Sequence, residues 1–132
     1  MLKKTITYTD YDGNTRTEDF YFNLNKAEIA EMELSTNGGM EKMLTQIVNS
    51  QDGKRIMEVF KGIILKAYGV KTADGKRFEK SEEISKAFEQ TEAYSELFME
   101  LVTDAEKAAA FINGIVPVVK AASPAPAISV NK

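Results

Sequence analysis

The sequence predicts an α+β fold that is mainly α-helical, with an N-terminal β-hairpin packed on five to six helices. Two observations support this prediction. Residues 2–22 alternate between apolar and polar side chains around an Asp-Gly turn signal, and residues 25–116 repeat apolar residues at helical spacing. We expect residues 1–117 to form a single globular domain. Residues 118–132 have few large side chains and contain Pro124 and Pro126, so we expect a disordered, flexible tail.

The hairpin is predicted from two short strands on either side of Asp12-Gly13-Asn14. A two-residue loop would pair Ile6 with Asp19 and place Phe20 and Phe22 on the opposite face. A three-residue loop instead pairs Ile6 with Phe20 and keeps the apolar side chains together. Because a slip of one residue moves every side chain to the other face, we prefer the odd-length loop.

Polar residues mark the predicted starts of the helices. In a capping box, the first residue and a Glu three positions later satisfy each other's backbone N–H groups. The predicted starts are Asn25 (with Glu28, running to about Leu34), Ser81, Thr91 and Thr103 (with Glu106).

Residues 53–68 show the widest apolar face, and we expect them to form the central helix. Leu65 is the only large apolar residue of this segment that lies outside the face. Asp52 is a predicted N-cap, and Gly69 is predicted to end the helix in the left-handed conformation. We interpret residues 70–80 as a polar, basic connector and residues 40–48 as a further helix. The apolar face comprises Ile56, Met57, Val59, Phe60, Ile63, Ile64, Ala67 and Tyr68.

The composition excludes several kinds of chemistry. The sequence has no cysteine and no histidine, which excludes disulfides, thiol nucleophiles, imidazole bases and nearly all zinc sites. We find no catalytic signature, so we expect neither an enzyme nor a bound cofactor. The sequence has no apolar run long enough to cross a membrane and does not begin like a signal peptide, so we expect a cytoplasmic protein without a membrane partner.

Charge is divided unevenly along the chain. Residues 61–80 are basic but have few aromatic residues and no nucleic-acid motif, so we do not expect a nucleic-acid partner. Residues 81–112 are strongly acidic, and such a division can attract a second copy of the chain or another charged partner. The acidic residues of the second segment are Glu82, Glu83, Glu89, Glu92, Glu96, Glu100, Asp104 and Glu106.

Spacings of three and four place an acidic stripe, Glu89, Glu92, Glu96 and Glu100, on one side of the helix that starts near Thr91. The stripe is either a docking face for a basic partner, a cation site, or a solvated face. Met99 and Leu65 lie off the apolar faces of their helices, and we expect both to be exposed. The candidate partner-binding residues are therefore Glu92, Glu96, Met99, Glu100 and Leu65.

Three parts of the sequence together resemble a known family. They are the hairpin with Phe20-Tyr21-Phe22-Asn23-Leu24, then Phe78-Glu79-Lys80-Ser81 with FEQTEAYSELFMEL from Phe88, and AAAFINGIVP from Ala108. The family is the tail assembly chaperone family of long-tailed bacteriophages. The resemblance implies a non-catalytic protein of the host cytoplasm that coats the tape-measure protein, recruits subunits of the major tail protein and then leaves. The alternatives are a structural tail or head–tail completion protein retained in the virion, or a phage regulatory protein that binds a host target.

Overall fold

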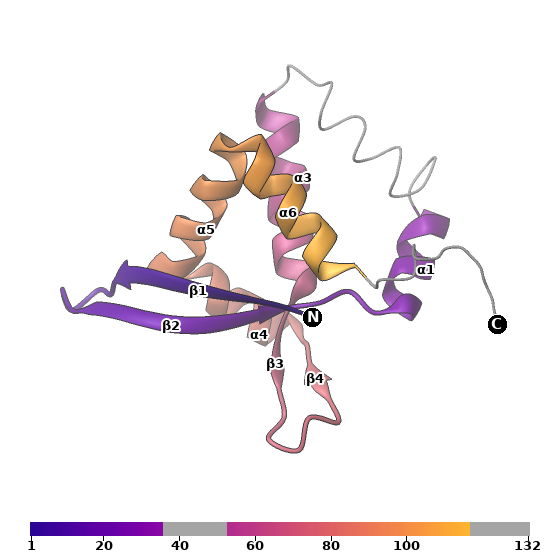
Figure 1. The fold of residues 1–132 in the computed structure, drawn as a ribbon, viewed down its shortest axis with the longest axis horizontal. Coiled ribbons are helices and arrows are strands. Elements are labelled where there is room, and N and C mark those ends of the chain that lie inside the picture. The colour runs from indigo at the N-terminus through magenta and orange to yellow at the C-terminus, as the bar shows by residue number, and fades with distance from the viewer. Residues whose placement is uncertain (36–52, 117–132) are drawn as a thin grey trace.

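The computed structural model describes residues 1–35 and 53–116, which form a four-stranded antiparallel sheet and five helices (Figure 1). This arrangement confirms the predicted fold class, while the expected helix at residues 40–48 and the tail at 118–132 lie outside the described residues. The strands are β1 (Leu2–Thr9), β2 (Thr15–Phe22), β3 (Tyr68–Lys71) and β4 (Phe78–Glu79), in that spatial order. The helices are α1 (Lys26–Ser35), α3 (Gly53–Ala67), α4 (Glu82–Glu89), α5 (Glu92–Thr103) and α6 (Ala105–Ile115).

Strands β1 and β2 form the predicted hairpin, although its register differs from the expected one. Ile6 lies opposite Glu18, so the predicted pair of Ile6 with Phe20 is wrong by two residues. The loop is longer because the Asp10 carboxylate accepts the backbone N–H groups of Asp12 and Asn14, which starts the turn earlier. Its length is still odd, and Ile6 therefore shares a face with Phe20 as predicted.

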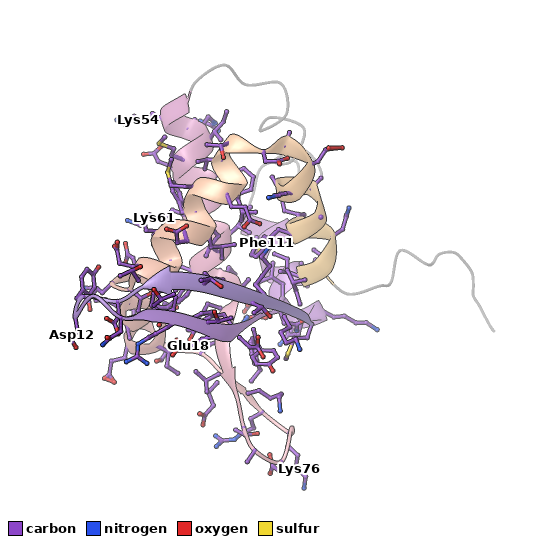
Figure 2. The ribbon with its side chains drawn as sticks, turned by 60° about the vertical axis from the view of Figure 1, so that its left-hand side comes forward. Asp12, Glu18, Lys54, Lys61, Lys76 and Phe111 are labelled. Atoms are coloured by element: carbon purple, nitrogen blue, oxygen red, sulfur yellow. The ribbon has the colours of Figure 1, made fainter. Side chains whose placement is uncertain are left out.

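Side chains from the sheet and the helices meet in one apolar core. Phe22 is fully buried, and its ring lies 5.3 Å from that of Phe111 and 5.7 Å from that of Phe88, measured between centroids. Tyr68 stacks on Phe88 at 4.2 Å. Figure 2 shows Phe111 within the helical part of the molecule, on the side of the β1–β2 hairpin. These rings join strands and helices that are distant in the sequence.

Helix α3 contributes Phe60, Ile63, Ile64 and Ala67 to this core, as the periodic pattern predicts. The prediction for Met57 is wrong, since its side chain is 47% exposed. All four buried residues of α3 lie in the second half of the helix. The first turns carry the same pattern, but there Ile56 and Val59 are only half-buried against the core.

Gly69 does not end α3 in the left-handed conformation, and that prediction is wrong. It lies in β3, and among the glycines of residues 1–35 and 53–116 those with positive φ are Gly13 and Gly75. A Cβ atom at Gly69 would lie 2.7 Å from Phe78 Cε2 and 2.9 Å from the backbone oxygen of Glu79. The glycine is therefore needed for the close approach of β4. Residues 70–80 form a β-hairpin instead of the expected connector, with Asp74-Gly75 at its turn.

Most of the predicted helix starts are confirmed. Asn25 and Glu28 exchange both hydrogen bonds of a capping box, at 2.9 and 2.8 Å, and Ser81 and Thr91 cap α4 and α5. The predicted cap at Thr103 is wrong. Its hydroxyl donates to the Met99 carbonyl within α5, while the carboxylate of Asp104, with extended backbone, accepts two N–H groups of α6.

Candidate functional site

The exposed side of α5 carries three of the five predicted partner-binding residues. The helix buries Ala93, Leu97 and Leu101 on its opposite side. Glu92, Glu96 and Met99 follow each other at spacings of four and three, and they form a ridge of about 10 Å at 1.5 Å per residue. The Met99 side chain is 50% exposed, as predicted. The structure thus brings Glu92, Glu96 and Met99 together on one solvent-facing ridge.

Tyr11 extends this ridge from a distant part of the sequence. It belongs to the β1–β2 turn, is 76% exposed, and its hydroxyl donates to the Gln90 carbonyl at 3.1 Å. The same hydroxyl lies 3.3 Å from a carboxylate oxygen of Glu92. Partial desolvation and the Glu92 charge raise the pKa of the Tyr11 phenol. We call Tyr11, Glu92, Glu96 and Met99 the α5 surface.

Tyr11 is a residue that the sequence-based prediction missed. Its contact with the α4–α5 junction depends on how the hairpin packs on the helices, and no periodic pattern encodes this. The one available signal was an aromatic residue beside the polar Asp-Gly turn, because such a turn lies at the surface. An aromatic side chain there is exposed unless another element covers it.

Two members of the predicted acidic stripe are neutralised within the chain. Glu100 forms an ion pair with Lys4 of β1 at 2.8 Å, and Glu89, which belongs to α4 and not to α5, pairs with Lys61 of α3 at 2.9 Å. The Glu89 partner raises the pKa of the Lys61 ammonium group. Both pairs join separate elements, so these two carboxylates have a structural role. Glu96 has no ion-pair partner among residues 1–35 and 53–116.

Leu65 lies in a different part of the molecule. Its side chain is half-buried against the core, so the expectation of an exposed residue is wrong. Ser85 of α4 donates a hydrogen bond to the Leu65 carbonyl at 3.0 Å, which brings α4 against this side of α3. Leu65 lines a groove of about 380 Å³ to which α5 contributes no residue; the other lining residues are Glu28, Lys66, Lys80, Ser81, Glu82 and Ser85.

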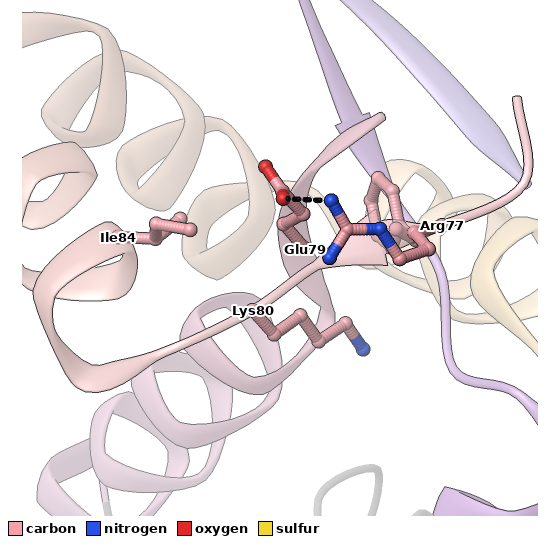
Figure 3. A pocket seen from close by; sticks show the side chains of 5 residues that line it. Arg77, Glu79, Lys80 and Ile84 are labelled. Atoms are coloured by element: carbon pink, nitrogen blue, oxygen red, sulfur yellow. Dashed lines mark ion pairs between the residues drawn. The ribbon is translucent and has the colours of Figure 1, made fainter. Parts of the chain in front are cut away.

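Lys80 also lines a second groove of about 580 Å³, together with Arg77, Phe78, Glu79 and Ile84. Figure 3 shows Arg77 turned toward Glu79, with which it pairs at 2.9 Å, while the Lys80 ammonium group points away from both. That ammonium group donates to the Asn23 carbonyl and to the Glu28 carboxylate, both at 2.7 Å. Arg77 and Lys80 therefore both have partners within the chain. The contacts of Lys80 with Asn23 and Glu28 hold the first turn of α1 in place.

The described part of the chain shows no cluster of three or more acidic residues suited to hold a metal ion. None of the described helices is both long and apolar enough to cross a membrane. The exposed side chains of the α5 surface provide carboxylates, one phenol and one thioether. Such a set suits contact with another protein, because it combines charge with exposed aromatic and apolar groups.

Comparison with protein families gives a match that covers nearly the whole chain. The model of a family described as phage tail assembly chaperone matches residues 1–124. The matched range includes both hairpins, all described helices and the α5 surface. Comparison with curated proteins and with solved structures finds no match.

Proposed function

Because the chain belongs to the phage tail assembly chaperone family, we propose that it binds the tape-measure protein and recruits tail-tube subunits to it. The family match over residues 1–124 carries this proposal. We further propose that the protein acts in the host cytoplasm and catalyses no reaction. The lack of cysteine and histidine in the sequence supports a binding role, since two common sources of nucleophiles and bases are missing.

A chaperone of this kind has a clear physical task. A long helical protein exposes apolar stripes before its partners assemble around it, and exposed apolar stripes associate with one another in water. A small domain that covers such stripes keeps the long protein in solution. Helical partners are recognised by side chains at spacings of three and four, which is also the spacing on the α5 surface.

The proposal is tested by co-expression of the full chain with the tape-measure protein of the same phage. We expect the chain to raise the soluble fraction of the tape-measure protein and to co-elute with it in size-exclusion chromatography. A tagged pull-down from phage-producing cells, analysed by mass spectrometry, should recover both that protein and tail-tube subunits. Recovery of host proteins alone would contradict the proposal and support a regulatory protein.

Purified virions distinguish the chaperone from a structural subunit. A chaperone leaves before the tail is complete, so quantitative mass spectrometry should find the tail-tube protein and not this chain. A fixed number of copies per virion would contradict the chaperone role and support a tail or head–tail completion protein.

A further inference from the structure

We propose that the α5 surface, formed by Tyr11, Glu92, Glu96 and Met99, is a docking site for a cationic amphipathic helix of a partner protein. This inference rests on the proposed function for one point only, namely that the helix belongs to a phage tail protein. The surface itself is argued from contacts and charges within this chain.

Glu96 provides the central charge of the surface. Glu92 has a local role, because an acidic residue in the first turn of α5 interacts favourably with the helix dipole. Glu96 lies one turn further along, where that effect has faded, and its like charge repels Glu92. Since no described cation pairs with Glu96, its carboxylate is available to a cation from outside the chain.

The surroundings of Glu96 strengthen the preference for a positive partner. Glu82, Glu83 and Glu106 are also exposed. Their carboxylates form no hydrogen bond or ion pair with the described residues. In contrast, Lys4 and Lys61 are already paired with Glu100 and Glu89. Helices α4, α5 and α6, with Asp104 between the last two, carry eight carboxylates against only Lys86 and Lys107, and this negative field attracts and orients a cationic segment.

Tyr11 and Met99 give the surface an apolar contact at each end. Tyr11 contacts Glu92 through its hydroxyl, and Met99 lies one turn beyond Glu96 on the same ridge. Tyrosine is common among residues that dominate binding energy, and methionine adapts to varied apolar partners. The tip of the β1–β2 hairpin, near the Asp12 label in Figure 2, is held at the start of α5 by the Tyr11 hydrogen bond.

This arrangement determines the chemistry of the occupant. Two carboxylates one helical turn apart match lysine or arginine residues at i and i+4 on a facing helix. Apolar residues on either side of those cations would contact Tyr11 and Met99. The occupant is therefore a helix of about three turns, with two cations between apolar positions.

The probe is a synthetic amphipathic helical peptide that carries lysines at i and i+4 between leucines, with a fluorescent label at one end. A second peptide with glutamines in place of the lysines controls for the charge. Fluorescence anisotropy with the full chain should show binding of the lysine peptide, weakened at high salt, and at least tenfold weaker binding of the glutamine peptide.

Two pairs of variants locate the site. Glu96→Lys should weaken binding of the lysine peptide by about tenfold or more, whereas Glu106→Lys, an equal charge change on α6, should have a much smaller effect. Met99→Ser should weaken binding more than Val70→Ser, which alters an exposed apolar residue of β3. Circular dichroism would confirm that all four variants remain folded.

Equal effects of Glu96→Lys and Glu106→Lys would overturn the proposal, because binding would then depend on overall charge and not on the α5 surface. Equal binding of the two peptides would also overturn it. The failure of the proposed function is distinguishable from both outcomes, since it appears as an absence of the tape-measure protein from the pull-down.

Discussion

Gly69 provides the sharpest test of the fold, through the substitution Gly69→Ala. The new Cβ would lie 2.7 Å from the Phe78 ring and 2.9 Å from the Glu79 backbone oxygen. The half-buried ring can move aside, but the backbone oxygen belongs to the strand that pairs with Val70. Its displacement disturbs the β3–β4 pairing, and we expect a loss of about 1–3 kcal/mol in the free energy of unfolding, as for other overpacked sites.

Gly62→Ala is the matched control, because it is the same chemical change in a different environment. Gly62 is exposed within α3, and a Cβ there meets no atom within 4 Å. Alanine is favoured over glycine inside a helix by about 0.5–1 kcal/mol, so this variant should be more stable than the parent. Relative to the parent protein, the free energy of unfolding should therefore fall in the Gly69→Ala variant and rise in the Gly62→Ala variant.

Urea denaturation followed by circular dichroism measures both effects as changes in the midpoint at constant slope. A Gly69→Ala protein as stable as the Gly62→Ala protein would refute the close approach of β4 to Gly69.

Two further predictions concern polar contacts. Lys80→Ala removes the Lys80 donor from the Asn23 carbonyl and from one oxygen of the Glu28 carboxylate, so we expect a loss of about 1–3 kcal/mol in the free energy of unfolding and faster hydrogen exchange in the first turn of α1. Lys76→Ala at the tip of the β3–β4 hairpin should change little, and equal effects would contradict the role of Lys80. Arg16 and then the Asn14 N–H lower the pKa of the Asp10 carboxyl below its ordinary value. The stability that this carboxylate contributes is therefore complete above the unfolded-state pKa of about 3.9 and is lost as the pH falls through the lower folded-state pKa. An NMR titration of Asp10 with a midpoint at or above the unfolded-state pKa would contradict the lowered pKa and the stability that it contributes.

The features that the sequence predicted well are those in which neighbouring residues act on each other. The capping box of Asn25 and Glu28 spans three residues, and Ser81 caps the helix that directly follows it. The apolar face of α3 is likewise a property of one helix. Such patterns are fixed by backbone geometry, so they remain visible without knowledge of the fold.

The predictions that failed depend on contacts between distant segments. Nothing near Gly69 shows that Phe78 will lie against it, and β4 is only two residues long. At Thr103 two adjacent residues competed for the same cap, and Asp104 took it. Leu65 was expected to be exposed because its own helix has no apolar face there, but α4 packs beside it.

The acidic stripe shows the same limit at the candidate site. Its spacing was visible in the sequence, yet its division into neutralised and available carboxylates was not. Glu100 is neutralised by Lys4, which lies 96 residues away, and Tyr11 reaches Glu92 across 81 residues. The difference between Glu100, which is paired, and Glu96, which has no ion-pair partner in the described part of the chain, therefore arises only when the hairpin packs on α5.

The small size of the α5 surface is compatible with the proposed function, in which the partner is later released. A stable protein interface buries about 800 Å² on each side, which is far more than four exposed side chains provide. Exposed carboxylates are also screened by salt, so each contact with a cationic helix is weak and short-lived. Under the proposed function, many copies along one long tape-measure protein would still cover it, because a copy that leaves is replaced from a high local concentration. Growth of the tail tube would then displace the copies one at a time, without an input of chemical energy.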